Sequence, residues 1–277
     1  SSAAAAAAIP ARRGGFKDSG SVAVGGELPL VAPVPLSSER DFRQEMEVAT
    51  ATLALAPNPD WLGRMAAMTR VEALILGGAV EQFPEAFVEV SRPLTASLSL
   101  QFKERRSSIT RQACHLIAVL AAVLGPRFEA QAVGILPTLV SQLVITVQIM
   151  AETSDACIKE ILVRCPTPRV LQYICDATCK EKNPKTRQWC AGYLRLILES
   201  WEVGSWGRSL DFVEAAIRFS AQDSLVDTRS AGRSAFAAYC RVIPDRAMAF
   251  YSRLEGSLQE KLKTALTGSG GGGGGGG

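Results

Sequence analysis

The sequence has a single histidine, His115, and none of the short motifs that mark common catalytic or cofactor sites. No phosphate-binding loop, dinucleotide-binding glycine pattern or zinc-ligand spacing is present. His115 lies inside an apolar run with no second catalytic group near it in sequence, which predicts a hydrogen-bonded core histidine. An enzyme would need an unexpected closed pocket around His115 or a cysteine thiolate. We therefore expect no catalysis and no cofactor.

The sequence also lacks a regular pattern of cysteine pairs. It has seven cysteines, an odd number, spread along the chain. This pattern argues against a disulfide scaffold and predicts a reducing compartment. Cys175 and Cys179 could share one helix face, but no second pair or suitable histidine completes a metal site. We expect small buried apolar side chains there and no metal.

No apolar run reaches the roughly 20 residues of a membrane span. The run from Ala113 to Gly125 stops at Pro126, and the run at 132–147 is interrupted by Pro137. Both are predicted to be buried core helices, and no membrane partner is expected. The formal net charge of +3 is too small to mark a nucleic-acid-binding protein.

Composition divides the chain into three parts. Residues 1–36 carry an alanine run, several Gly and Pro and few large apolar side chains, and residues 267–277 are mostly glycine. Neither segment can bury enough apolar surface to offset its ordering entropy, so both are predicted to be disordered. Residues 37–266 are predicted to form one monomeric domain. We expect the sequence to be an excerpt of a longer protein, with the glycine tail as a flexible tether to another part of it.

Apolar residues recur at helical spacing through this domain, and no strand-like alternation of useful length appears. Ser38 and Asp60 are suitable N-caps, and Pro184 suits the first position of a helix. Helices are expected near 38–55, 61–77, 80–101, 105–125, 128–144, 149–164, 168–180, 184–202, 207–221, 224–242, 244–252 and 256–266. Six antiparallel pairs with repeats of about 40 residues predict an all-α HEAT-repeat solenoid.

Basic residues cluster at the starts of alternate helices. A stack of helical hairpins brings alternate turns to the same edge. Five such turns therefore predict a binding surface for a large acidic partner. The turns contain Asp60-Trp61-Leu62-Gly63-Arg64, Glu104 to Arg111, Gln148-Ile149-Met150, Pro184-Lys185-Thr186-Arg187 and Asp223 to Arg229.

These residues resemble the TOG domains of the CLASP family of microtubule-associated proteins, above all the second TOG domain, with crescerin-type ciliary TOG domains as relatives. The resemblance runs from about Ser37 to Leu266. It rests on the order and spacing of Asp60-Trp61 with Arg64, Arg106-Ser107 with Arg111-Gln112-Ala113-Cys114, Leu124 to Glu129, Ile149-Met150-Ala151, Arg187 with Leu196 to Trp201, and Asp223 with Arg229 and Arg233.

The resemblance implies a domain that binds curved αβ-tubulin through its intra-repeat loops and promotes rescue or suppresses catastrophe. It places Trp61 against β-tubulin and Arg229, with Arg233 nearby, against α-tubulin. The implied partner-binding residues are Trp61, Arg106, Met150, Lys185, Arg187, Arg229 and Arg233. The expected location is the cytoplasmic microtubule cytoskeleton or a cilium, where other microtubule-associated proteins are further candidate partners.

The sequence departs from the family pattern at three positions. Gln148 stands where Lys is common, Arg105 where an apolar residue is usual, and Trp189 where Arg often follows. The Gln148 change weakens the expected charge of the third loop, which Arg105 could partly offset.

Structural alternatives remain open for several of these residues. Trp61 could fold back as a hydrophobic staple, and Met150 could pack in the core. Arg111 and Arg233 are expected to be mostly structural, and Asp223 to cap a helix and brace its loop. Arg64 is expected to pair with Asp60 or a neighbouring loop, and Trp201 and Trp206 to pack.

A second functional class also stays open. The same solenoid could serve as a HEAT-repeat scaffold in a centrosomal, ciliary or axonemal complex without binding the tubulin dimer. Retained folding without tubulin binding would favour that alternative.

Overall fold

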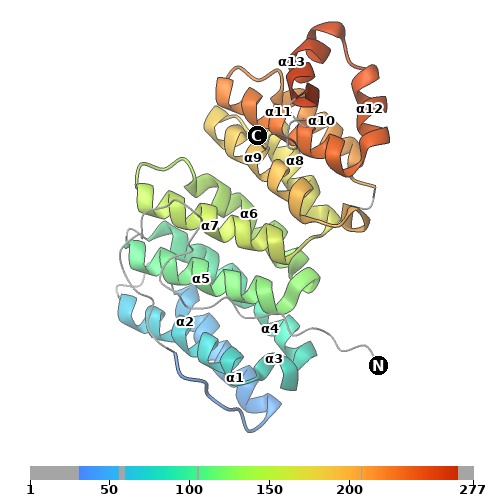
Figure 1. Ribbon diagram of the computed structural model, residues 1–277. Helices are drawn as coiled ribbons and strands as arrows, with labels where there is room; N and C mark the ends of the chain where they lie inside the picture. The colour runs from blue at the N-terminus through green and yellow to red at the C-terminus, as the bar shows by residue number, and fades with distance from the viewer. Residues whose placement is uncertain (1–30, 56–59, 105, 207, 268–277) are drawn as a thin grey trace, which may run out of the picture. The chain divides into compact units, whose positions relative to one another are not determined.

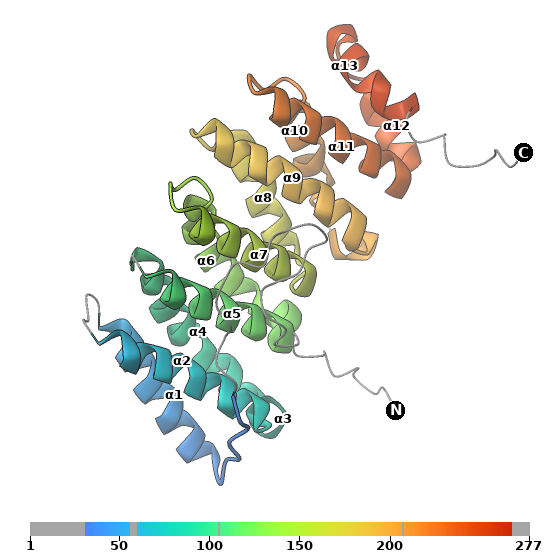
Figure 2. The same ribbon diagram turned by 60° about the vertical axis from the view of Figure 1, so that its left-hand side comes forward.

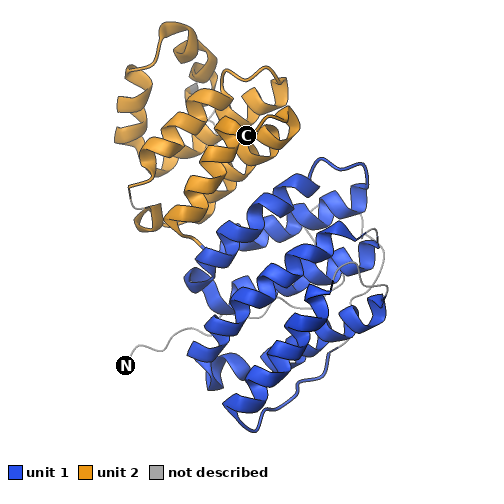
Figure 3. Ribbon diagram, turned by 180° about the vertical axis from the view of Figure 1, so that it is seen from behind, with its two compact units in different colours: residues 1–165 blue, residues 166–277 orange. Residues whose placement is uncertain are grey.

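The computed structural model describes residues 31–55, 60–104, 106–206 and 208–267. Every regular element in these ranges is a helix (Figure 1). The chain forms two compact units, one ending at Cys165 and one beginning at Pro166 (Figure 3).

The first unit is a two-layered stack. Figure 2 shows α2, α5 and α7 side by side in one layer, with α1, α4 and α6 behind them. The first residues of α2, α5 and α7 lie at one edge of the unit (Figure 2), so the starts of alternate helices share an edge here, as predicted. The elements are α1 (Glu39–Ala54), α2 (Trp61–Leu76), α3 (Ala79–Gln82), α4 (Pro84–Leu100), η1 (Gln101–Lys103), α5 (Ser107–Leu124), η2 (Gly125–Phe128), α6 (Glu129–Gln142) and α7 (Gln148–Arg164).

The second unit continues the same construction. Helices α9 and α11 pack together, α8 packs on α9 and α10, and α11 also contacts α12 and α13. The turns before α9 and α11 lie at one edge of this unit (Figure 2). Its elements are α8 (Pro168–Lys180), α9 (Pro184–Ser200), η3 (Val203–Trp206), α10 (Leu210–Ser220), α11 (Val226–Val242), α12 (Pro244–Ser252) and α13 (Gly256–Thr267).

Local capping explains where these helices begin. The Ser38 hydroxyl accepts from the Asp41 N–H (3.1 Å), and the Asp60 carboxylate accepts from the Gly63 N–H (2.8 Å). Both groups satisfy amide donors that a helix start leaves unpaired. Pro84 and Pro184 occupy first helical positions, where a missing N–H costs nothing. The two predicted N-caps are confirmed.

One predicted helix is wrong in its extent. The helix expected at 80–101 is split into α3 and α4 at Phe83, whose φ of −132° and ψ of 57° are not helical. The cause is Pro84, because a proline ring clashes with a helical conformation of the residue before it.

Residues 31–36 correct the expected disorder of residues 1–36. The Val34 N–H donates to the Ala73 carbonyl oxygen of α2 (3.0 Å). A Cβ added to Gly77 would lie 1.9 Å from the Val34 carbonyl oxygen, so glycine at 77 permits this close approach. The rest of the expected disorder falls on residues 1–30 and 268–277, which lie outside the described residues.

Helix α5 forms the centre of the first unit, and its body from Ala113 to Ala122 is buried. His115 Nε2 lies 3.1 Å from the Glu72 carboxylate of α2, and both side chains are buried. The predicted core histidine is confirmed. The stretch Ser107–Gln142 is long and apolar enough to match a membrane span by composition, but 61% of its matching window is buried inside the fold. It is interrupted at Gly125, whose φ is +54°.

Five of the seven cysteines and two of the tryptophans are buried in the interior. None of the seven cysteines forms a disulfide with another described residue, and burial raises the pKa of the Cys190 thiol to about 12. Cys175 is buried, whereas Cys179 is half-buried. Trp201 and Trp206 are buried, which confirms their predicted packing role.

Candidate functional site

The first two predicted loops meet at Trp61. Trp61 is the first residue of α2 and is half-buried. The guanidinium of Arg106, which precedes α5, lies over its ring at 5.7 Å from the ring centroid. A cation over an indole face is attracted by the ring quadrupole, by about 0.5–1 kcal/mol at an exposed site. The Arg106 side chain is 52% exposed, so this pair presents both an aromatic surface and a charge.

A carboxylate beneath the pair connects it to the interior. Glu104 Oε2 accepts from Nη2 of the buried Arg64 (2.6 Å), and Glu104 Oε1 lies 3.7 Å from Arg106 Nη1. Arg64 also donates to Gln101 Oε1 (2.9 Å), and Gln101 donates to the Leu53 carbonyl oxygen (2.7 Å). Arg64 therefore links α2 to the loop before α5. This confirms the predicted pairing of Arg64 with a neighbouring loop.

The third loop differs from the prediction. Met150 is only 5% exposed, so its expected role as a partner contact is wrong and the core alternative describes it. The exposed apolar residues of this loop are Val144 and Val147. Gln148 donates to Glu152 Oε1 (2.7 Å) on the same helix.

Arg187 in the fourth loop also has a different role from the predicted one. Its side chain is 14% exposed, with Nε 2.7 Å and Nη2 3.4 Å from the two Asp223 carboxylate oxygens. Its Nη1 donates to the carbonyl oxygens of Glu181 and Lys182. The guanidinium thus braces the loops of the fold, a role that the predicted partner contact did not include, and it has few donors left for a partner.

The Asp223 carboxylate accepts the hydrogen bonds that join the two loops. Besides Arg187, it accepts from the Leu225 N–H (2.9 Å) at the start of α11. Burial would raise the pKa of Asp223, but the hydrogen bonds from Arg187 and Leu225 outweigh it and hold the pKa below its ordinary value. The predicted loop brace is confirmed, but the predicted helix cap is not, because the N-cap of α11 is Leu225 and its helix start has no side-chain cap.

Two cations of the second unit keep free donors. Arg229 uses only Nη1, which donates to the carbonyl oxygens of Asp223 and Ser224 (2.8 Å each). Its Nε and Nη2 have no acceptor within the described ranges. The Lys185 side chain is 60% exposed, with Nζ 3.0 Å from Gln188 Oε1 and 3.8 Å from an Asp227 oxygen. Both side chains remain available at the shared edge of the α9 and α11 turns.

Arg233, one turn beyond Arg229, does not brace the fold. Its guanidinium makes no hydrogen bond or ion pair to any residue that the structure describes. It lines a pocket between α11 and α13. The expectation that Arg233 is mostly structural is therefore wrong.

Several exposed apolar residues beside these groups were not predicted. Leu62 is 62% exposed next to Trp61, and Val226 is 63% exposed at the start of α11. Trp189 is 38% exposed and stacks on Tyr193 with ring centroids 6.3 Å apart. Leu62 and Val226 are aliphatic residues in the first turn of a helix. The sequence could have indicated their exposure only through the predicted exposure of those helix starts.

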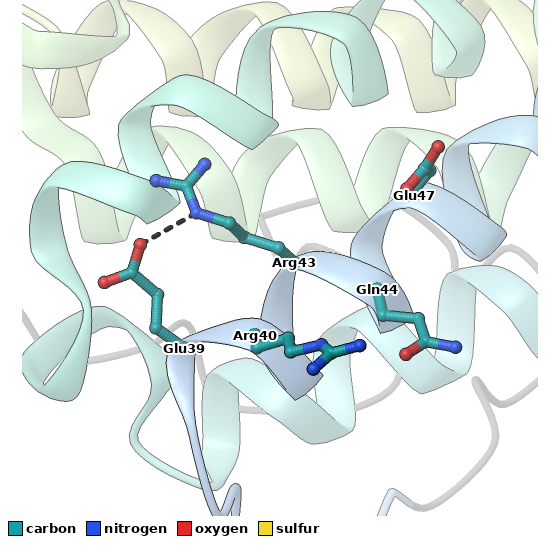
Figure 4. Close-up of a pocket in the computed structure, with 5 residues that line it drawn as sticks. All are labelled: Glu39, Arg40, Arg43, Gln44 and Glu47. Atoms are coloured by element: carbon teal, nitrogen blue, oxygen red, sulfur yellow. Dashed lines mark hydrogen bonds and ion pairs between the residues drawn. The ribbon is translucent and has the colours of Figure 1, made fainter.

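The open space along α1 has none of the marks of a reaction site. About 590 Å³ is lined by side chains of one exposed helix face, and the only interaction among the five residues drawn is the Arg43–Glu39 ion pair (Figure 4). The described parts of the chain contain no group of three or more His, Cys, Asp or Glu side chains placed to hold a metal.

The sequence matches the family described as CLASP N terminal over residues 43–263. The chain belongs to the CLASP N-terminal family. It is 35% identical to a CLIP-associated protein of Arabidopsis thaliana over 83% of its length, and 27% identical to CLIP-associating protein 1 of Xenopus tropicalis over 86%. It spans 16% of the length of each of these relatives.

Comparison with solved structures shows which fold this chain has. A TOG-domain array from a study of tubulin recruitment by microtubule polymerases matches with a TM-score of 0.60 and 16% identity, over 86% of this chain and 48% of the array. This CLASP N-terminal domain therefore has the all-α HEAT-repeat fold of TOG domains, as predicted.

Proposed function

We propose that this domain binds αβ-tubulin through the turns that precede its alternate helices and thereby regulates microtubule dynamics. The observation that carries the proposal is the Trp61–Arg106 pair, an accessible aromatic ring under a cation, backed by Glu104 and the buried Arg64. A ring held in this way loses little conformational entropy on binding, which is typical of an interface anchor.

The second unit contributes charge. Lys185 and Arg229 have donors left for acidic groups of a partner. Val226 adds an exposed apolar contact beside Arg229. The contact set we propose is therefore Trp61, Leu62 and Arg106 in the first unit and Lys185, Val226 and Arg229 in the second.

The regulatory effect follows from a difference in affinity. A surface that fits curved tubulin better than straight tubulin shifts the balance between the two forms by that difference alone. No bond is made or broken in this mechanism. Membership of the family and the TOG fold support it, and they favour a place on the microtubule cytoskeleton; a cilium is one such place.

Co-elution of the full chain with unpolymerised αβ-tubulin tests the proposal. We expect Trp61→Ala and Arg229→Ala each to weaken binding at least tenfold, since each removes a contact with no substitute nearby. Arg92→Ala and Arg218→Ala are matched controls, because both remove exposed arginines of α4 and α10 that have no described ion pair. They are expected to bind like the wild type.

A folded wild-type chain that fails to bind tubulin would contradict the proposal and leave a scaffold role as the better account. Equal loss in the controls and the loop variants would show a diffuse charge effect and would contradict the assignment of the site.

A further inference from the structure

The second unit carries a pocket that the proposed tubulin contacts do not use. It lies between α11 and α13, is open to solvent and has a volume of about 280 Å³. Its lining consists of Ser230, Arg233, Ser234, Ala237 and Arg241 from α11 with Thr264 and Ala265 from α13. Two guanidiniums and small side chains thus line it, and no carboxylate does.

The two arginines are available to a ligand in different ways. Arg233 has no partner in the described parts of the chain, so all its donors face water or a ligand. Arg241 Nη2 lies 2.8 Å from Glu199 Oε1 on α9, and the same carboxylate oxygen accepts from Arg195 Nε (3.0 Å). A ligand that takes Arg241 therefore leaves Glu199 with a second cation.

The spacing of the arginines predicts the shape of the ligand. Arg233 and Arg241 are eight residues apart on α11 and both line the pocket, so their Cα atoms are about 12 Å apart along the helix axis at a rise of 1.5 Å per residue. A ligand with two separated anionic groups can pair with both guanidiniums without drawing the two side chains toward each other. In an extended chain, residues i and i+4 point to the same side about 13 Å apart.

The floor between the arginines suits a peptide backbone. Ser234 and Ala237 are small, which lets a backbone approach the helix closely. The hydroxyls of Ser230 and Ser234 make no hydrogen bond to described residues, so they can serve the amide groups of a bound chain.

We propose that this pocket binds an extended acidic segment of a partner protein, with two carboxylates four residues apart. One carboxylate pairs with Arg233 and the other with Arg241, each in the bidentate geometry that guanidinium and carboxylate share. The site is distinct from Trp61, Lys185 and Arg229, none of which lines it. It therefore does not depend on the proposed tubulin contacts.

Fluorescence anisotropy at low ionic strength tests this proposal on the full chain. The probe is a Gly/Ser peptide with a neutral fluorophore and Glu at positions i and i+4. We expect Arg233→Gln and Arg241→Gln each to weaken binding about three- to tenfold, as partly exposed charge pairs do, and the double variant to abolish it. Arg218→Gln, on α10, is the matched control and should bind like the wild type.

Three results would overturn the proposal. The first is an unchanged affinity in the double variant with retained helicity. The second is equal binding of a peptide with Glu at i and i+2, which carries the same charge over about 7 Å. The third is complete displacement of the probe by inorganic phosphate at constant ionic strength, which would show a simple anion site. Trp61→Ala should leave probe binding unchanged, which separates this site from the loops.

Discussion

The loop arginines fall into two groups, according to which groups accept their hydrogen bonds. Arg64 and Arg187 are consumed by Glu104 and Asp223 inside the fold, whereas Arg106 and Arg229 keep donors for a partner. The division follows burial, since a buried guanidinium without a carboxylate would be far too costly. A loop arginine is thus a binding candidate only when donors remain after its contacts within the fold are made.

Glu104 is the residue on which the first-unit loops depend. We expect Glu104→Gln to lower the free energy of unfolding by about 1–3 kcal/mol, because Arg64 keeps its burial but loses its charged partner. Urea denaturation followed by circular dichroism at neutral pH measures this. Glu89→Gln, which removes a carboxylate that pairs with Arg43 at a far more exposed site, should change stability by less than about 0.5 kcal/mol. Equal effects of the two substitutions would contradict the bracing role of Glu104.

Residue-level predictions from the sequence failed where the deciding neighbour is distant in the chain. Arg187 and Asp223 are 36 positions apart, so the sequence around Arg187 does not indicate that Asp223 is its partner. Met150 is turned inward by the packing of α7 on α5 and α6. Trp61 and Arg106 were found because their positions at helix starts, together with the family resemblance, mark exposed loop sites.

Helices, in contrast, were largely predictable because their signals are local. Proline and N-cap residues fix starts such as Trp61 and Pro184 through steric and hydrogen-bonding rules that need no tertiary context. The same reasoning missed the break at Phe83, where Pro84 interrupts an otherwise continuous apolar pattern. It also missed residues 31–36, whose order depends on contact with α2.

The brace between the α8–α9 and α10–α11 turns has a predictable pH dependence. The folded pKa of Asp223 is lower than its unfolded pKa, so its stabilising contribution is present above about pH 4 and is lost as pH falls through the folded pKa. We expect Asp223→Asn to destabilise the fold by about 1–3 kcal/mol at pH 7.

The destabilisation should shrink as the pH falls below 4, where the wild-type carboxylate becomes protonated. Chemical denaturation at a series of pH values, with Glu202→Gln as an exposed control, measures this difference. A difference that stays constant with pH would contradict the ionic character of the brace.

The net charge of the whole molecule, +3, is small, so long-range attraction to an acidic partner depends on a few placed cations. We expect tubulin affinity to fall as salt rises, because exposed charges are screened beyond about 8 Å at physiological ionic strength. Arg229→Ala should reduce the steepness of this dependence. Trp61→Ala should lower affinity by a similar factor at every salt concentration.

Titrations of the wild type and both variants across a salt series compare the two slopes. A Trp61→Ala variant with the shallower slope would show that the ring acts mainly by positioning Arg106.

The four tryptophans differ in their exposure to solvent, and this difference makes their fluorescence a reporter of binding. Trp201 and Trp206 are shielded, so a collisional quencher such as acrylamide reaches chiefly Trp61 and Trp189. In a Trp189→Phe background the quenchable emission comes from the ring under Arg106. Any partner that covers this ring would then protect a single known fluorophore, and occupancy of the first loop could be followed without an attached dye.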